Sequence, residues 1–302
     1  CHIVFVAGDE EYRSEEALPL LARSMNALGF ECTVLFSQNP ETGEIDPNES
    51  TYIPGLEKII DADLLVLQLR FRELTDSDMK YVVDYVEAGK PLIGIRTSTH
   101  AFNYKKNKES KYAHWSWASA KWPGGFGKQI LGETWVAHHG HHGKQATRGL
   151  VASKHAVANG VDVCFGTTDV YAINDLPDDA TVILHGEVVA GMKVEDAAVA
   201  GAKNDPMHPV AWLRERVLDE KTTQRIFATT MGAAADWCDI DLRRLFINST
   251  LWCLDNADAI PVNGFPAPLI GEYQPTNFGF DSARLGYKPN DYRNGSPWQE
   301  TE

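Results

Sequence analysis

The chain has 302 residues, 43% hydrophobic and 23% charged, which is a globular composition with enough apolar material for a sizeable core. Its 42 acidic and 28 basic residues give a formal net charge of −14, which argues against nucleic acid and anionic membranes as partners because an acidic surface repels phosphate groups. No apolar run reaches the roughly 20 residues that span a bilayer. The five cysteines form no C-x-x-C pair, which argues against a disulfide framework or a thiolate zinc site.

The first hundred residues alternate between apolar runs and segments with helical spacing. The expected strands are 2–7, 31–36, 64–67 and 91–95, and the expected helices begin at Ser14 and Thr75 and end at Gly29 and Gly89. This order predicts an α/β fold with a mainly parallel central sheet and helices on both faces. Ligands of such sheets bind outside the carboxyl ends of the strands, where the loops 8–13, 68–73 and 96–103 are rich in polar groups.

The remainder of the chain is less regular. Residues 103–145 predict a long aromatic-rich loop of the kind that covers a site. Further strands are expected at 167–173, 181–188 and 225–230, and a closing helix at about 239–254. We therefore expect one α/β domain over 1–260 and an extended Pro/Gly-rich strap over 261–302.

Several stretches, in this order along the chain, carry a family resemblance. They are GIRTSTHAF at 94–102, GETWVAH at 132–138, PVAW at 209–212, RIFATTMG at 225–232, and RLF at 244–246 followed by Trp252. This ordered set resembles the ThuA-like (trehalose-utilisation-like) family. The resemblance implies a flavodoxin-like fold, similar to that of class I glutamine amidotransferases, and an activity on oxidised sugars such as 3-keto-glycosides.

The sequence departs from these relatives at two positions. The amidotransferase pattern has a nucleophilic cysteine on the turn after the fourth strand, where this chain has Arg96, Thr97 and Ser98. A cysteine-dependent amidotransferase is therefore not expected. Many ThuA-like proteins have a histidine near the end, where this chain has Ala233.

Four of the chain's 10 histidines lie in the run His138-His139-Gly140-His141-His142. If the run is extended, His139 and His141 share one face and can form half of a zinc or manganese site, completed by Glu133 or His100. A solvated loop is the alternative. The histidine that matches the family pattern is His138, and it is our candidate for the acid–base group, because imidazole titrates near neutral pH. Its alternative is a structural histidine bonded to backbone.

The remaining candidates follow the parallel strands. Arg96 is expected either to hold a substrate oxyanion or to form an ion pair with Glu10 or Glu133, and His100 lies on the same turn. Glu10 is a candidate base or sugar ligand. Arg13, Arg72 and Trp135 are expected to contact substrate. We expect the catalytic set to line one pocket with Trp135 in its wall, and that set is Glu10, Arg96, His100, Glu133 and His138.

These features leave three hypotheses about function. The first is an enzyme that acts on a small carbohydrate, such as a 3-keto-glycoside, by hydrolysis, elimination or isomerisation. The second is a non-catalytic carbohydrate-binding or accessory subunit, and the third is an assembly protein or homo-oligomer whose strap binds a neighbour. The glycines at 124–127 lack the spacing of a phosphate loop, so no nucleotide is expected. The chain opens on Cys1, which fits either a removed signal peptide, and hence a periplasmic or secreted protein, or trimming of the chain.

Overall fold

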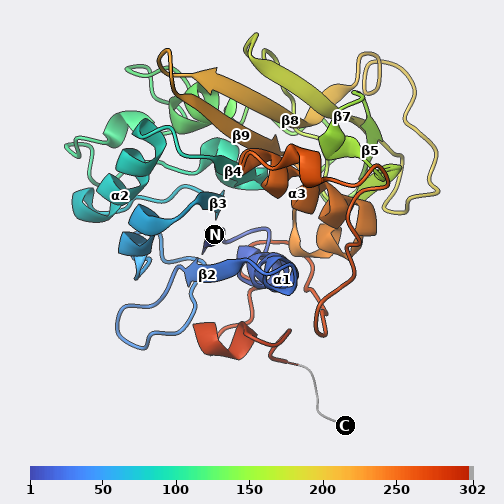
Figure 1. Ribbon diagram of the computed structural model, residues 1–302. Helices are drawn as coiled ribbons and strands as arrows, with labels where there is room; N and C mark the ends of the chain where they lie inside the picture. Colours follow the sequence, from blue (N-terminus) through green and yellow to red (C-terminus); the bar gives the residue numbers. More distant parts are fainter. Residues whose placement is uncertain (299–302) are drawn as a thin grey trace.

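The computed structural model describes residues 1–298 and contains one sheet of nine strands in the order β2-β1-β3-β4-β9-β8-β7-β5-β6 (Figure 1). The strands are β1 His2–Gly8, β2 Glu31–Phe36, β3 Leu64–Leu69, β4 Leu92–Ile95, β5 Thr147–Val151, β6 Val163–Gly166, β7 Ala180–Val188, β8 His208–Val217 and β9 Thr223–Thr229. The half from β2 to β9 is parallel. The half from β9 to β6 is antiparallel. The sheet is therefore mixed, and the expectation of a mainly parallel sheet is correct only for its first half.

Helices cover both faces of the sheet, as expected. The helices α1 Ser14–Ala27 and α3 Ile240–Cys253 pack on one face, where their apolar residues join Phe5 and Ile93 in one hydrophobic cluster. The helix α2 Asp76–Glu87 packs on the other face with Val4 and Leu65. Alternate residues of β1 enter opposite clusters because successive side chains of a strand point to opposite faces. No helix in residues 1–298 has the length and apolar character that crossing a membrane requires.

The expected strand at 167–173 is wrong. The backbone amides of Thr167 and Thr168 donate to the carboxylate of Asp236, so they are not available to a neighbouring strand. The only β-bridge in this segment is an isolated one that pairs Tyr171 with His138. The segment is consequently a bent connection that runs past the carboxyl edge of the parallel strands.

The long loop at 103–145 is irregular, as expected, apart from two short helices. One of these, a π-helical turn at Gly127–Leu131, lies directly on the turn that follows β4. A Cβ atom at Gly127 would be 1.9 Å from the carbonyl oxygen of Thr99, so only glycine permits this approach. The loop is thus held against the end of β4, next to Arg96.

Residues after α3 pack against their own domain. Arg23 of α1 donates to the carbonyls of Ile270 and Tyr292, at 2.9 and 3.0 Å. Glu16 accepts from both the amide and the hydroxyl of Thr276. Figure 1 shows this segment, in red, passing α1. In its described part, the strap expected over 261–302 therefore bonds to α1 of the same chain.

Glu15 is a buried carboxyl group in the first turn of α1. Its side chain is 3% exposed, and neither carboxyl oxygen has a hydrogen-bond partner among the described residues. Burial, reinforced by the charge of Glu16, raises the pKa of Glu15 to about 8 although Arg13 opposes the shift. The folded state therefore binds a proton that the unfolded chain releases near its ordinary pKa of 4.5.

We predict that Glu15→Gln matches the parent in stability at pH 5 and exceeds it at pH 8. Because the folded pKa is the higher one, the parent loses stability as the pH rises between 4.5 and about 8, whereas glutamine has no charge to bury. With pKa values of 4.5 and about 8, the difference at pH 8 should be about 4 kcal/mol in urea denaturation. Parallel pH profiles for the two proteins would contradict the prediction.

Candidate functional site

The site is built around a buried ion pair between Arg96 and Asp169. Arg96 follows β4 directly with a positive φ of 45° and begins a short helical turn, Arg96–His100. Its fully buried guanidinium donates to the Asp169 carboxylate at 2.9 Å, to the Asp169 carbonyl at 2.8 Å and to the Tyr12 hydroxyl at 3.2 Å. It also donates to the carbonyl of Thr230 and lies 3.7 Å from the ring centre of Tyr171. Both terminal nitrogens of Arg96 bond to protein groups, Nε has no hydrogen-bond partner among the described residues, and the fully buried guanidinium does not reach a substrate.

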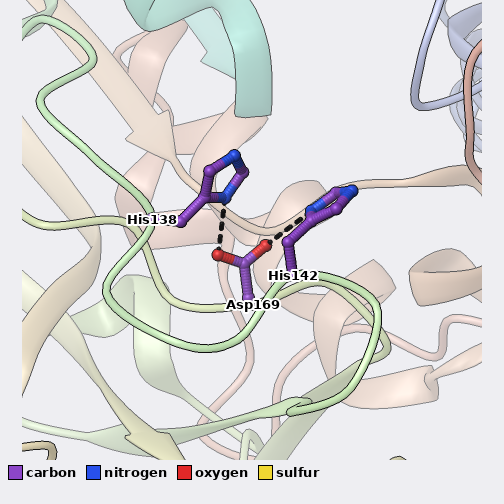
Figure 2. Close-up of side chains that lie close together, drawn as sticks. All are labelled: His138, His142 and Asp169. Carbon is purple, nitrogen blue, oxygen red and sulfur yellow. Dashed lines mark hydrogen bonds and ion pairs between the residues drawn. The ribbon is translucent and has the colours of Figure 1, made fainter.

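The Asp169 carboxylate is shared between two histidines (Figure 2). One oxygen lies 2.8 Å from Nδ1 of His138, and the other lies 3.2 Å from Nδ1 of His142. Burial alone raises the pKa of Asp169, but the hydrogen bonds from His138 and His142 and the charge of Arg96 outweigh burial and hold the pKa below its ordinary value. The carboxylate is therefore ionised at neutral pH, and its charge fixes the direction of both imidazoles.

The two imidazoles separate the hidden carboxylate from solvent. The side chain of Asp169 is 0% exposed, whereas those of His138 and His142 are 35% and 37% exposed. The other nitrogen of His142, Nε2, lies 3.3 Å from the carboxylate of Glu11. His142 thus bridges two carboxylates, an arrangement in which only the protonated imidazole donates from both nitrogens. His138 has a carboxylate on one side only.

Aromatic rings surround the histidines. Trp135 lies 5.8 Å from His138 and 5.8 Å from His100, measured between ring centres, and Phe71 lies 5.0 Å from His100. Burial, followed by the charges of Arg70 and Arg96, holds the pKa of His100 well below its ordinary value. His100 is therefore a neutral member of an aromatic wall and does not supply a charge.

The strap supplies a further aromatic residue. Phe278 lies 5.2 Å from His142 and 5.3 Å from Tyr12 between ring centres. The amide of Gly279 donates to the Glu11 carbonyl at 2.8 Å. The buried guanidinium of Arg13 donates to the Gly279 carbonyl, so this arginine holds the strap. The expected contact between Arg13 and a substrate is therefore not available.

Glu10 and Arg72 also bond to the protein. The two form an ion pair at 2.6 Å, and Arg70 binds the other oxygen of Glu10. Arg72 is 2% exposed and also donates to the carbonyls of Pro47 and Glu49, at 3.0 and 2.8 Å. Glu10 is therefore not the partner of Arg96, and the expected substrate contact of Arg72 is not available.

In the described part of the chain, the side chains of Glu133, His139 and His141 form no hydrogen bond or ion pair with Asp169. The buried carboxylate of Glu133 accepts from the amides of Asn174 and Asp175, at 3.3 and 3.1 Å, and so holds backbone. His139 lies 2.8 Å from the carbonyl oxygen of Lys203 through Nε2, and His141 is exposed. The expectation that His139 and His141 share one face is wrong, because the chain turns at Gly140 and makes His138 and His142 converge instead.

No protein-family model and no curated protein matches the chain. Among solved structures, the chain is similar to a protein from Parabacteroides merdae that is named as ThuA-like. The match spans 97% of this chain and 98% of that protein, with a TM-score of 0.52 at 14% sequence identity. The chain has the fold of a ThuA-like protein. A second structure named as ThuA-like, from Bacteroides uniformis, covers 83% of this chain and 90% of its own, with a TM-score of 0.49 at 12% identity. The glutaminase domain of Trypanosoma brucei CTPS covers 89% and 96%, with a TM-score of 0.39 at 8% identity.

Within this ThuA-like fold, the structure brings together Arg96, His100, Trp135 and His138, which the sequence had singled out. Asp169, on which the arrangement is centred, was not among the residues predicted from the sequence. Asp169 lies in a segment that was expected to be a strand, and no motif or spacing distinguished it from the other acidic residues. His142 was recognised only as part of the histidine run.

We predict that Arg96→Lys lowers the free energy of unfolding by about 3 kcal/mol or more, because lysine cannot replace the planar set of donors and leaves buried acceptors unpaired. Arg148→Lys is the control: its ion pair with Glu187 is about one fifth exposed, and the change should cost less than about 1 kcal/mol. Equal losses in guanidinium denaturation would show that Arg96 does not organise the interior.

Proposed function

We propose that the chain is a carbohydrate-active enzyme of the ThuA-like family that acts on a 3-keto-glycoside or a related oxidised sugar. The observation that carries the proposal is the hydrogen bond between His138 and a buried, ionised Asp169. A carboxylate at Nδ1 fixes the tautomer of a neutral imidazole and leaves Nε2 as the basic nitrogen. Because His138 is accessible while Asp169 is not, a substrate can reach this base.

The chemistry of an oxidised sugar suits such a base. A 3-keto group acidifies the neighbouring C–H bonds, and proton abstraction there gives an enolate. In an elimination, the enolate expels a leaving group from the carbon next to the one that lost the proton. In an isomerisation, it takes a proton back at another position. Elimination and isomerisation both follow from one well-placed base and need no cysteine. Among the described residues, no cysteine is hydrogen-bonded to Arg96, His100 or His138.

The surroundings of His138 favour a sugar as the ligand. Trp135 is half-buried, so part of its indole is open to stack on the C–H face of a pyranose. Arg96 acts through Asp169 as a positioning residue. We also place the parallel half of the sheet, with order β2-β1-β3-β4-β9, in the flavodoxin-like class, whose ligands bind where the strand order reverses. Glu11 and Arg70 follow β1 and β3, the two strands at that reversal.

The binding-only and assembly hypotheses have less support. A protein that only binds a sugar has no need of an imidazole polarised by a buried carboxylate. The assembly hypothesis depended on a strap that binds a neighbour, and in this structure the strap bonds to Glu16 and Arg23 of its own helix.

The test is turnover of 3-keto disaccharides, followed by product analysis, with the unoxidised disaccharides as reference. We predict that His138→Ala lowers kcat by about 100-fold or more while leaving the melting temperature nearly unchanged, because the side chain is one third exposed. His139→Ala, in which the lost contact is with the carbonyl of Lys203, should retain activity. Failure of the parent to convert any keto-sugar that it binds would reduce the function to binding alone.

A further inference from the structure

The donor atoms of His138, His142 and Asp169 form a compact group. One nitrogen from each imidazole and one carboxylate oxygen all lie within 4.8 Å of one another. Figure 2 shows the two rings on the same side of Asp169, each directing Nδ1 at a different oxygen. Two segments far apart in the sequence meet here, and the bend at Gly140 places both histidines on one side of the carboxylate.

Asp169 and His142 are each oriented by a further charged residue. Asp169 is held by Arg96 at 2.9 Å, and Nε2 of His142 faces the carboxylate of Glu11 at 3.3 Å. A hydrogen bond from Nε2 to a carboxylate leaves Nδ1 of a neutral imidazole as the nitrogen with the lone pair. This relay from carboxylate to histidine to metal is the usual outer layer of a metal centre.

Each of the two carboxylates near the group is also paired with an arginine. Asp169 bonds to Arg96 at 2.9 Å and Glu11 lies 3.3 Å from Arg70, so the ligand set for a cation comes from the donor atoms and not from an excess of negative charge. In the absence of a metal, protons on the two Nδ1 atoms join the imidazoles to the carboxylate. A divalent ion would replace those protons and release them to solvent.

We propose that His138, His142 and Asp169 bind one divalent transition-metal ion, zinc or manganese. Two imidazoles and one carboxylate are a ligand set that suits these ions, and three protein ligands leave a position open. Since both imidazoles are about one third exposed, the open position faces solvent and can take a water molecule or the keto oxygen of a sugar.

This proposal deepens the proposed function and rests on it for the identity of the substrate, but it replaces the free base. With the ion bound, His138 would be a ligand, and the ion would polarise the keto oxygen or supply a bound hydroxide that accepts the proton in place of His138. The site differs from the expected pair His139 and His141, and this difference provides the controls for the experiment.

The experiment is titration calorimetry of the chelator-treated, full-length chain with zinc chloride and with manganese chloride, together with the visible spectrum of the cobalt-substituted protein. We expect one ion per chain for at least one metal. His142→Ala and Asp169→Asn should each weaken binding by more than about 10-fold and change the cobalt spectrum. His139→Ala and His141→Ala should bind like the parent.

The outcomes separate the two proposals. If neither metal binds the parent, or if His142→Ala binds as tightly as the parent, the metal site is refuted. Equal losses in His139→Ala or His141→Ala would also refute it, because the ion would then be held by surface histidines. Should Asp169→Asn fail to fold, His142→Ala carries the test, since 37% of the His142 side chain is exposed and none of the Asp169 side chain is. Full turnover of keto-sugars by the chelated protein would refute a metal role and leave the proposed function intact. One bound ion without turnover would support the metal site and contradict the proposed function.

Discussion

The arrangement of the site depends on one buried ion pair, that between Arg96 and Asp169. Removing two charges from water costs several kcal/mol, and the cost is offset only when the remaining donors and acceptors are satisfied. Here the guanidinium follows β4, and its partners come from the loop after β1, the residue after β9 and the 168–171 segment. A shift of the 168–171 segment would leave the charge of Arg96 unpaired in the interior. The positions of His138 and His142 are therefore set by a residue that neither of them contacts directly.

The ion pair is one end of a longer series of contacts at the carboxyl edge of the parallel strands. Positive and negative groups alternate along it, with a histidine between two carboxylates, and the order is Arg72, Glu10, Arg70, Glu11, His142, Asp169, Arg96. The series joins the loops after β1, β3 and β4 to the histidine run, so a change of charge at one end alters the field at the other. This explains why several residues that the sequence marked as substrate contacts are occupied by protein partners.

The sequence predicted the parallel half of the fold closely because buried parallel strands are short, uninterrupted apolar runs. The expected strand at 31–36 has the bounds of β2, and the other three agree with β1, β3 and β4 to within two residues. The antiparallel half was harder: β5 begins with Thr147-Arg148-Gly149, and β8 contains a proline and three charged residues, so neither has the apolar pattern of a core strand. Arg96, His100 and His138 could be found because a strand end or a dense histidine run marked them. Asp169 could not, because its importance arises only when Arg96 and two histidines close around it.

The position of Phe278 and Gly279 has a consequence for how the protein is made. The sheet and its covering helices lie between residues 2 and 253, so a nascent chain can form them before the residues that contact Tyr12, Arg13 and His142 have been translated. Ala267 and Tyr292 of the strap also belong to the hydrophobic cluster that α1 and α3 share, so the strap completes the core as well as the site. Loss of the strap after synthesis would leave one side of His142 bare and part of that cluster uncovered.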